Sequence, residues 1–234
     1  MGSSRLPGKV MKRVNGIPIL GYLIERLKAV KSIDEIVIAT TTNPLDSEVE
    51  EFARTSHVQC FRGSETNVLE RVMHAASMLD ATTIVQITGD CPLIDPDIIE
   101  QVIQMYYANK TDYMTNSVIR SYPDGMDVQV FSLSSLHRSY QMTSDPLDLE
   151  HVSRYMYKNP HIFTISHLIA PPSLFYPKLA LTLDEPEDLE LIRELITQLY
   201  PINPLFDCKS IIDYIRNTYN MKPPNSAVSR KGCD

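Results

Sequence analysis

The spacing of apolar residues alternates between two periods along the first 90 positions. From residue 17 to residue 30 they recur every three or four positions, which predicts a helix, whereas residues 36–39 form the short continuous apolar run of a buried strand. The alternation continues and predicts helices at 44–53 and 68–79 and strands at 58–61 and 84–87. Short buried strands separated by helices favour a parallel sheet covered on both faces, which is the doubly wound α/β plan.

The second half of the chain has a less regular pattern. It predicts strands at 113–115, 126–131 and 162–167 and helices at 147–158 and 186–199. We interpret this half as the substrate-facing part of one domain that spans residues 1–220. The polar segment 221–234 contains two adjacent prolines, and we expect it to be a loosely held tail.

Composition and charge narrow the class of protein. A chain of 234 residues with 43% hydrophobic and 22% charged residues is typical of one globular domain. The formal net charge of -7 argues against a nucleic-acid partner. No stretch approaches the ~20 apolar residues that a membrane span requires, so we expect a soluble protein without a membrane partner. Four widely spaced cysteines make a reducing, cytoplasmic location the simplest interpretation.

The opening segment, residues 2–9, reads Gly-Ser-Ser-Arg-Leu-Pro-Gly-Lys. Backbone N–H groups of such a glycine-rich turn, together with Arg5 and Lys9, suit a triphosphate. The segment is not a Walker A loop, because five residues separate its two glycines and Val10 follows the lysine. The alternative is a flexible terminus with incidental cations.

Two aspartates are candidates for a metal site. Asp90 follows the strand predicted at 84–87, and a carboxylate at the carboxyl end of a buried strand can hold a hard cation. Its alternative role as a helix cap is better filled by Asp95. Asp184 ends a second apolar run just before a predicted helix, where capping is a strong alternative for any acid.

Seven segments, in order, make the chain resemble the cytidylyltransferase family that includes CMP-sialic acid and CMP-KDO synthetases, and most closely its spore coat polysaccharide branch. The segments are 2–9, 36–41, 61–64, 88–95, 122–127, 150–152 and 183–188. The resemblance implies a single Rossmann-like domain with a mostly parallel sheet, of the nucleotide-diphospho-sugar transferase type. It also implies transfer of CMP from CTP to an acidic or phosphorylated sugar, with release of pyrophosphate, in cell-surface or spore-coat polysaccharide biosynthesis.

The resemblance also implies roles for individual residues. Arg5 and Lys9 would grip the triphosphate, while Asp90 and Asp184 would hold Mg²⁺. The implied nucleotide contacts are Gly2, Ser3, Ser4, Thr40, Thr41, Arg62, Gly63, Ser64, Asn67 and Arg71. The implied acceptor contacts are Asp124, Asp127, Glu150 and His151.

Several of these residues have ordinary structural alternatives. Arg71 could equally be a solvated helix residue, and Asp124 could serve only the turn Pro-Asp-Gly. A histidine on a helix beside a glutamate, as predicted for His151, more often has a structural role than a catalytic one. Cys91 follows Asp90, but no histidine is placed by sequence to activate it, so we interpret it as a packing residue.

The chain departs from the family before Met1, where relatives carry a hydrophobic strand that ends in Gln-Ala-Arg. That strand would lie at the sheet centre, between the strands predicted at 36–40 and 84–87. We expect that translation begins upstream of Met1 or, alternatively, that the protein is shortened. We therefore expect 36–40 and 84–87 to share one sheet without pairing, residues 2–9 to be poorly tied down, and the chain as given to be weakly stable.

Other functions stay open at this point. The same chemistry could use GTP or a different acceptor, because base choice depends on pocket contacts. A truncated, non-catalytic nucleotide-sugar binding protein is the alternative from another class. Relatives often form dimers through the second half of the domain, so a homodimer is a further expectation.

Overall fold

The computed structural model describes residue 2 and residues 5–228. Its helices are α1 (Ile19–Lys28), α2 (Ser47–Thr55), α3 (Val68–Met78), α4 (Pro96–Ala108), α5 (Leu133–Met142), α6 (Pro146–Glu150), α7 (Arg154–Lys158), α8 (Pro186–Leu199) and α9 (Cys208–Tyr219). Its strands are β1 (Arg13–Val14), β2 (Ile17–Pro18), β3 (Val37–Thr41), β4 (Gln59–Gly63), β5 (Thr83–Gln86), β6 (Tyr113–Thr115), β7 (Gln129–Ser132) and β8 (Ile165–His167). Short 3₁₀ turns are η1 (Lys9–Met11), η2 (Pro44–Asp46) and η3 (Pro224–Ala227).

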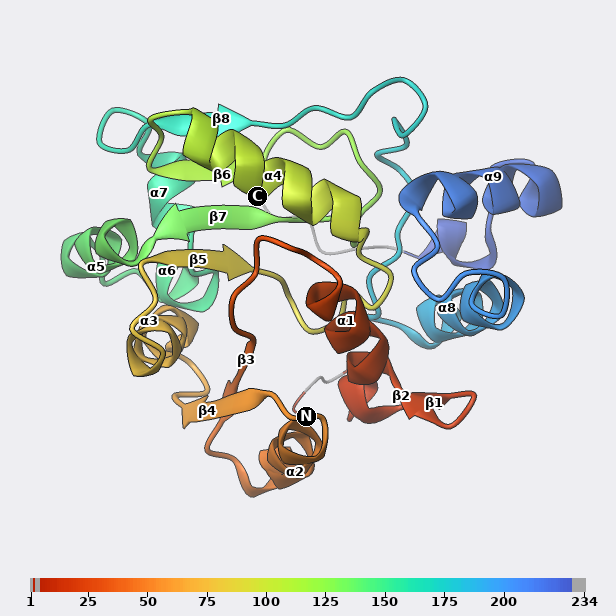
Figure 1. The fold of residues 1–234 in the computed structure, drawn as a ribbon, viewed down its shortest axis with the longest axis horizontal. Helices are drawn as coiled ribbons and strands as arrows, with labels where there is room; N and C mark the ends of the chain where they lie inside the picture. Colours follow the sequence, from red (N-terminus) through yellow and green to blue (C-terminus); the bar gives the residue numbers. More distant parts are fainter. Residues whose placement is uncertain (1, 3–4, 229–234) are drawn as a thin grey trace.

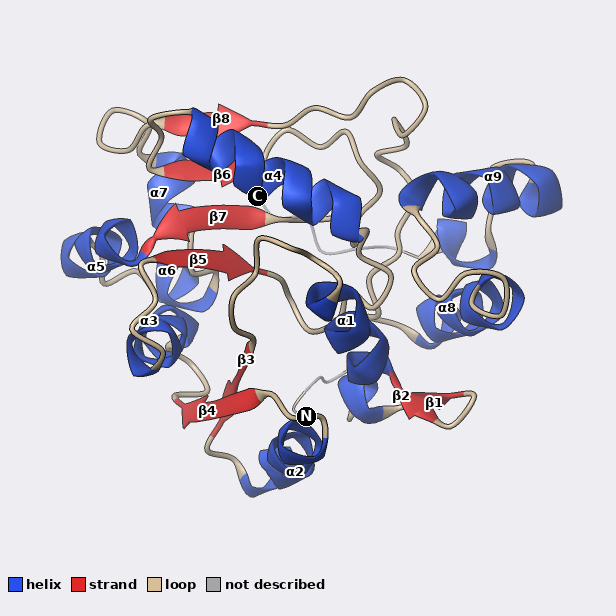
Figure 2. Cartoon of the chain, in the orientation of Figure 1, coloured by secondary structure: helices blue, strands red, loops and turns tan. Residues whose placement is uncertain are grey.

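The described strands form small sheets, the largest of them mixed, with helices packed around them, which confirms the doubly wound α/β class (Figures 1 and 2). β1 and β2 pair antiparallel in a short sheet of their own. β3 and β4 pair in parallel, and the larger sheet has the order β5-β7-β6-β8. In that sheet β6 and β8 are parallel, whereas β7 runs antiparallel to both of its neighbours. The alternation of helix and strand therefore predicted the layers, and the reversed direction of β7 is an addition from the structure.

Side chains on the larger sheet alternate between two hydrophobic clusters. Met114 and Val130 are fully buried in the cluster that includes the apolar residues of α4. Tyr113 and Phe131, their neighbours in sequence, are fully buried in the other cluster, with residues of α3, α5 and α7. Because successive strand residues point to opposite faces, the sheet is covered on both sides.

The gap at the centre of the predicted sheet is present among the described residues. β3 and β5 do not pair, as predicted. The prediction that they share one sheet is wrong, since β3 pairs with β4 in a separate two-stranded sheet. Figure 1 shows this pair apart from β5, with no labelled strand between them. Strands must lie about 4.8 Å apart to share hydrogen bonds, so without an intervening strand the ladder is interrupted.

Several predicted elements differ from those observed. The strand predicted at 162–167 is limited to β8 (Ile165–His167), and the helix predicted at 44–53 begins as η2 and continues as α2. Two further differences have a visible cause. The helix predicted at 147–158 is divided into α6 and α7, and Val152 between them has φ 40°. A β-branched residue rarely adopts this left-handed conformation, so the presence of a valine gave no reason to expect a break in the helix here. The strand predicted from residue 126 begins only at Gln129, because residues 123–126 form a turn closed by Met126 N–H and Pro123 O at 3.1 Å.

α5 and α9 were not predicted. Both begin with a side-chain cap that was visible in the sequence: Ser132 Oγ accepts from Ser135 N–H, and Asp207 Oδ1 accepts from Ser210 N–H.

No described helix is both long enough and apolar enough to span a bilayer.

The carboxyl-terminal segment is held more firmly than expected as far as Ala227. Asn225 in η3 is 3% exposed, and its Nδ2 donates to Ala180 O at 3.0 Å and to Asp188 Oδ1 at 2.8 Å. The expectation of a loosely held tail is therefore wrong for this stretch, and residues 229–234 lie outside the described part. A buried amide with two acceptors fixes η3 against α8.

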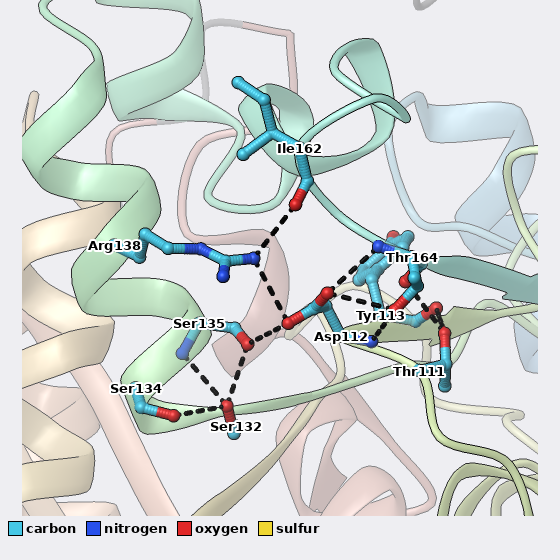
Figure 3. Close-up of polar contacts among 9 residues, drawn as sticks. All are labelled: Thr111, Asp112, Tyr113, Ser132, Ser134, Ser135, Arg138, Ile162 and Thr164. Atoms are coloured by element: carbon cyan, nitrogen blue, oxygen red, sulfur yellow. Dashed lines mark hydrogen bonds and ion pairs between the residues drawn. The ribbon is translucent and has the colours of Figure 1, made fainter.

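Asp112 joins three elements at the amino-terminal edge of the larger sheet (Figure 3). One carboxylate oxygen accepts from Ser135 Oγ at 3.1 Å and from Arg138 at 3.2 Å, both on α5. The other accepts from the backbone N–H of Thr164, just before β8, at 3.0 Å. Burial alone would raise the pKa of Asp112, but these hydrogen bonds and the nearby guanidinium hold it below its usual value.

We expect Asp112→Asn to lower the free energy of unfolding by about 1 to 3 kcal/mol at pH 7, because several donors lose a charged acceptor. A carboxyl whose pKa is lowered by folding stabilises the protein above its unfolded pKa of about 3.9 and loses that contribution as pH falls through its folded pKa. The difference between wild type and variant in urea unfolding should therefore shrink below about pH 4. A pH-independent difference, or one equal to that of the exposed control Asp213→Asn, would contradict this assignment.

Candidate active site

Backbone pairing brings Asp90 and Asp184 together from distant parts of the chain. Leu183 N–H donates to Asp90 O at 2.9 Å, so the residue before Asp184 is bound directly to Asp90. The same segment is anchored two residues earlier, where Leu181 N–H donates to Asp124 O at 2.7 Å. The carboxyl side of β5 and the residues leading into α8 thus lie alongside each other.

Lys9 lies between the two aspartates. Its Nζ is 2.7 Å from Asp90 Oδ2 and 2.9 Å from Asp184 Oδ1. The three side chains are 17%, 23% and 25% exposed, so the cluster is partly shielded but open to solvent on one side. The structure therefore joins three of the four predicted catalytic residues in one contact.

The charges in this cluster stabilise one another. Burial would lower the pKa of Lys9, but the two carboxylates raise it above its usual value, so the ammonium stays charged. Burial would raise the pKa of Asp90, but Lys9 holds it below its usual value. The pairing of Lys9 with Asp90 thus favours the charged form of both groups.

Arg5, the fourth predicted residue, lies at the edge of this cluster. Its Nη1 is 2.7 Å from Glu185 Oε1, and its Nη2 is 3.3 Å from Asp184 Oδ1. Leu6 beside it is buried in the main core. The expectation that residues 2–9 are poorly tied down is therefore wrong for residues 5–9, because ion pairs and an apolar anchor hold them.

The helix-capping alternatives are resolved by the hydrogen bonds at α4 and α8. Asp95 Oδ1 accepts from Asp97 N–H at 2.9 Å and caps α4, as predicted. At α8, Asp188 Oδ2 accepts from the backbone N–H groups of Asp184 and Glu185 at 3.0 and 2.9 Å. Capping thus uses other carboxylates, while those of Asp90 and Asp184 accept from Lys9.

Thr40 and Thr41, predicted as nucleotide contacts, are bound to a residue that the sequence analysis missed. Both hydroxyls donate to Asp46 Oδ2 at 2.7 Å. Burial would raise the pKa of Asp46, and the hydrogen bonds from these threonines are among the interactions that hold it below its usual value. The Asp46 carboxylate therefore holds the carboxyl end of β3 through hydrogen bonds. In the sequence, only the run of polar residues at the end of this strand indicated such a role for Asp46.

The residues of β4 and α3 that were predicted to contact the nucleotide also form hydrogen bonds within the protein. Arg62 donates to Thr41 O at 2.9 Å and to Asn43 O at 2.7 Å, which ties β4 to the loop after β3. Asn67 Oδ1 accepts from the backbone N–H of Glu70 and caps α3. Arg71 donates to Ser64 O at 2.5 Å. A Cβ added to Gly63 would lie 3.0 Å from the Arg71 side chain, so these two residues pack closely.

The amino-terminal members of the predicted set are only partly visible. Ser3 and Ser4 lie outside the described residues. Gly2 is exposed, and a Cβ added there would lie 3.3 Å from Glu65 Oε1. The predicted residues therefore fall into two groups. Hydrogen bonds connect those of β3 and β4, and ion pairs connect Lys9 with Asp90 and Asp184.

Asp124 and Asp127 lie beside the Lys9 cluster, and Arg120 joins them. The sequence analysis missed Arg120, which contacts both oxygens of Asp127 at 2.5 and 2.9 Å and lies 3.5 Å from Asp124. Burial raises the pKa of Asp127, and the negative charges of Asp124 and Asp90 add to this effect while Arg120 opposes it. The predicted acceptor side is therefore an acidic surface with one guanidinium.

Glu150 and His151 are both exposed at the end of α6. Cys91 is 1% exposed, and burial raises the pKa of its thiol well above the usual value. A thiol in this state is a poor nucleophile, in agreement with its interpretation as a packing residue. No group of three or more His, Cys, Asp or Glu side chains in residues 2 and 5–228 has the arrangement of a metal site.

Comparison with known proteins gives one consistent family. The sequence profile described as cytidylyltransferase matches residues 1–214. The chain is 34% identical over 231 residues to the uncharacterized protein MJ1063 of Methanocaldococcus jannaschii, covering 98% of this chain and 93% of that protein. It is 31% identical over 201 residues to the spore coat polysaccharide biosynthesis protein SpsF of Bacillus subtilis, covering 83% and 82%.

Solved structures agree with the sequence comparison. A cytidylyltransferase from Leptospira borgpetersenii superposes with a TM-score of 0.89 at 30% identity, covering 99% of this chain and 95% of that one. A CMP:2-keto-3-deoxy-manno-octonic acid synthetase complexed with CTP has a TM-score of 0.59 at 20% identity, covering 84% and 95%, which supports the fold alone. The chain belongs to the cytidylyltransferase family.

Proposed function

We propose that this protein transfers CMP from CTP to an acidic or phosphorylated sugar and releases pyrophosphate, with Mg²⁺ as cofactor. The observation that carries the proposal is the cation position between Asp90 and Asp184, with Arg5 at its edge. Family membership supports cytidylyl transfer, and the similarity to SpsF supports a role in polysaccharide biosynthesis.

The residues present fit a magnesium ion. One ammonium is within 2.9 Å of both carboxylates, so both can reach a single cation. Mg²⁺ is usually held by one or two carboxylates together with substrate phosphates and waters, which matches two aspartates beside a triphosphate site. When bound, the metal would neutralise phosphate charge and polarise the α-phosphate.

The protein's own residues would contribute position and charge. Lys9 and Arg5 would stabilise the negative charge that develops on the departing pyrophosphate. The bonds from Leu183 to Asp90 and from Leu181 to Asp124 would hold the metal side and the acceptor side at a fixed separation. The reaction is an in-line attack by an acceptor oxygen on the α-phosphorus, and it requires no covalent intermediate.

The acceptor would bind near Asp124 and Asp127. Their carboxylates suit sugar hydroxyls, and Arg120 supplies a cation for a carboxylate or phosphate on the acceptor. Relatives with partial similarity are named as 8-amino-3,8-dideoxy-manno-octulosonate cytidylyltransferases, for example from Shewanella frigidimarina at 33% identity over 108 residues. Such sugar acids are therefore suitable first acceptors to test.

With Mg²⁺ and a sugar-acid acceptor, we expect pyrophosphate release from CTP and at least about tenfold less from GTP, ATP or UTP, since a lost base contact costs one to several powers of ten. The test is a panel of the four triphosphates, each with 2-keto-3-deoxy-manno-octonic acid or its 8-amino analogue. A preference for GTP would show that the assignment of CTP as the substrate is wrong. Tight CTP binding without turnover for any acceptor would favour the non-catalytic alternative.

A further inference from the structure

The Lys9 ammonium occupies the position that the proposed function assigns to a metal. It contacts both candidate metal ligands at ion-pair distance, and the same lysine is the cation assigned to the triphosphate. One side chain cannot fill both places at once. The site must therefore change its cation during the reaction.

The ammonium is well matched to the two carboxylates. Two carboxylates held side by side by the Leu183 to Asp90 hydrogen bond repel each other, and an ammonium between them removes that repulsion. Lys9 is part of η1, and Met11 in the same turn is buried in the core, so the lysine backbone is fixed beneath the carboxylates. Binding of a second cation there must displace it.

Free Mg²⁺ would gain little by this displacement. Among the described residues, the site offers two carboxylates and no third acidic, histidine or cysteine ligand. Mg²⁺ requires near-octahedral oxygen coordination and loses its waters reluctantly. A triphosphate supplies the missing oxygens, and it also gives the displaced ammonium a new anionic partner.

We propose that Lys9 is the resident cation of this site, and that it yields the two aspartates only when metal and nucleotide enter together. The inference rests on the proposed function, since it takes Asp90 and Asp184 as the metal ligands. Lys9 then acts twice: it keeps the carboxylates paired in the free enzyme and moves to the phosphates in the complex. The consequence is that divalent metal alone binds weakly to the free protein.

The test is a titration of the complete chain with Mn²⁺, followed by water-proton relaxation without nucleotide. We expect Lys9→Met, which keeps an unbranched side chain one atom shorter and removes its charge, to bind Mn²⁺ at least about tenfold more tightly than wild type. Lys12→Met, three residues later, is the matched control and should bind as wild type does. Lys9→Arg keeps the charge and should also bind weakly.

The gain must come from the two aspartates. The double variant Lys9→Met/Asp90→Asn should therefore lose it, and circular dichroism should show that each variant is folded. Equal or weaker Mn²⁺ binding by folded Lys9→Met, or a gain that survives Asp90→Asn, would overturn the proposal.

A second titration separates this inference from the proposed function. In wild type with CTP present, Mn²⁺ binding should become tight and should depend on Asp90 and Asp184. If it does so while Lys9→Met leaves binding of free metal unchanged, only the exchange is wrong. If Asp90→Asn and Asp184→Asn leave the nucleotide-dependent binding unchanged, the metal assignment itself is wrong, and the exchange fails with it.

Discussion

Asp90→Asn and Asp184→Asn should each lower kcat by about a hundredfold to a thousandfold or more, by analogy with the loss of one preorganised electrostatic contact to a transition state. Both side chains are partly exposed and make their main described contact with Lys9, so the fold should survive. The measurement is pyrophosphate release with CTP and acceptor at saturating Mg²⁺, with thermal unfolding as the check on folding.

The control for this pair is Asp213→Asn. Asp213 forms exposed ion pairs with Lys209 and Arg216 on α9, so its loss removes the same charge without touching the cluster. Turnover of this variant should match wild type. A folded Asp90→Asn or Asp184→Asn enzyme with wild-type kcat would remove that residue from the metal site.

Gly125→Ala should have the largest effect on stability, about 2 to 5 kcal/mol of the free energy of unfolding. Gly125 has φ 101°, and a Cβ there would lie 2.8 Å from the backbone carbon of Leu181 and 3.0 Å from its oxygen. Both the backbone strain and the clash fall on the contact between the turn at Asp124 and the segment that leads to Asp184. Activity should therefore fall further than global unfolding explains.

Gly16→Ala separates these two causes. Gly16 has φ 83°, but a Cβ there would meet nothing within 4 Å, so only the backbone cost of about 1 to 2 kcal/mol applies. Urea unfolding of both variants, with kcat measured where each is fully folded, gives the comparison. Equal destabilisation by the two substitutions would show that close packing at Leu181 is unimportant.

The layers of this fold were predictable because secondary structure has local periods. Apolar spacing identified the helices that became α1, α3 and α8 and the strands that became β3, β4 and β5. Direction and partnership of strands are different, since they depend on residues far apart in the sequence. The reversed direction of β7 and the placement of β3 and β4 in a separate sheet therefore emerged only from the structure, whereas the lack of pairing between β3 and β5 was predicted. The break at Val152 was also missed, because apolar spacing does not indicate a left-handed backbone conformation.

The sequence by itself determined the chemistry available at the site: two aspartates at the ends of buried runs, an arginine and a lysine in a glycine-rich opening, and a family resemblance that joined them. Only the tertiary structure decided that Lys9 lies between Asp90 and Asp184, that Arg120 faces Asp127, and that Thr40 and Thr41 bind Asp46. The reason is physical. Residue type fixes charge and hydrogen-bonding capacity, whereas the distances that turn these groups into a site depend on how distant segments pair along their backbones.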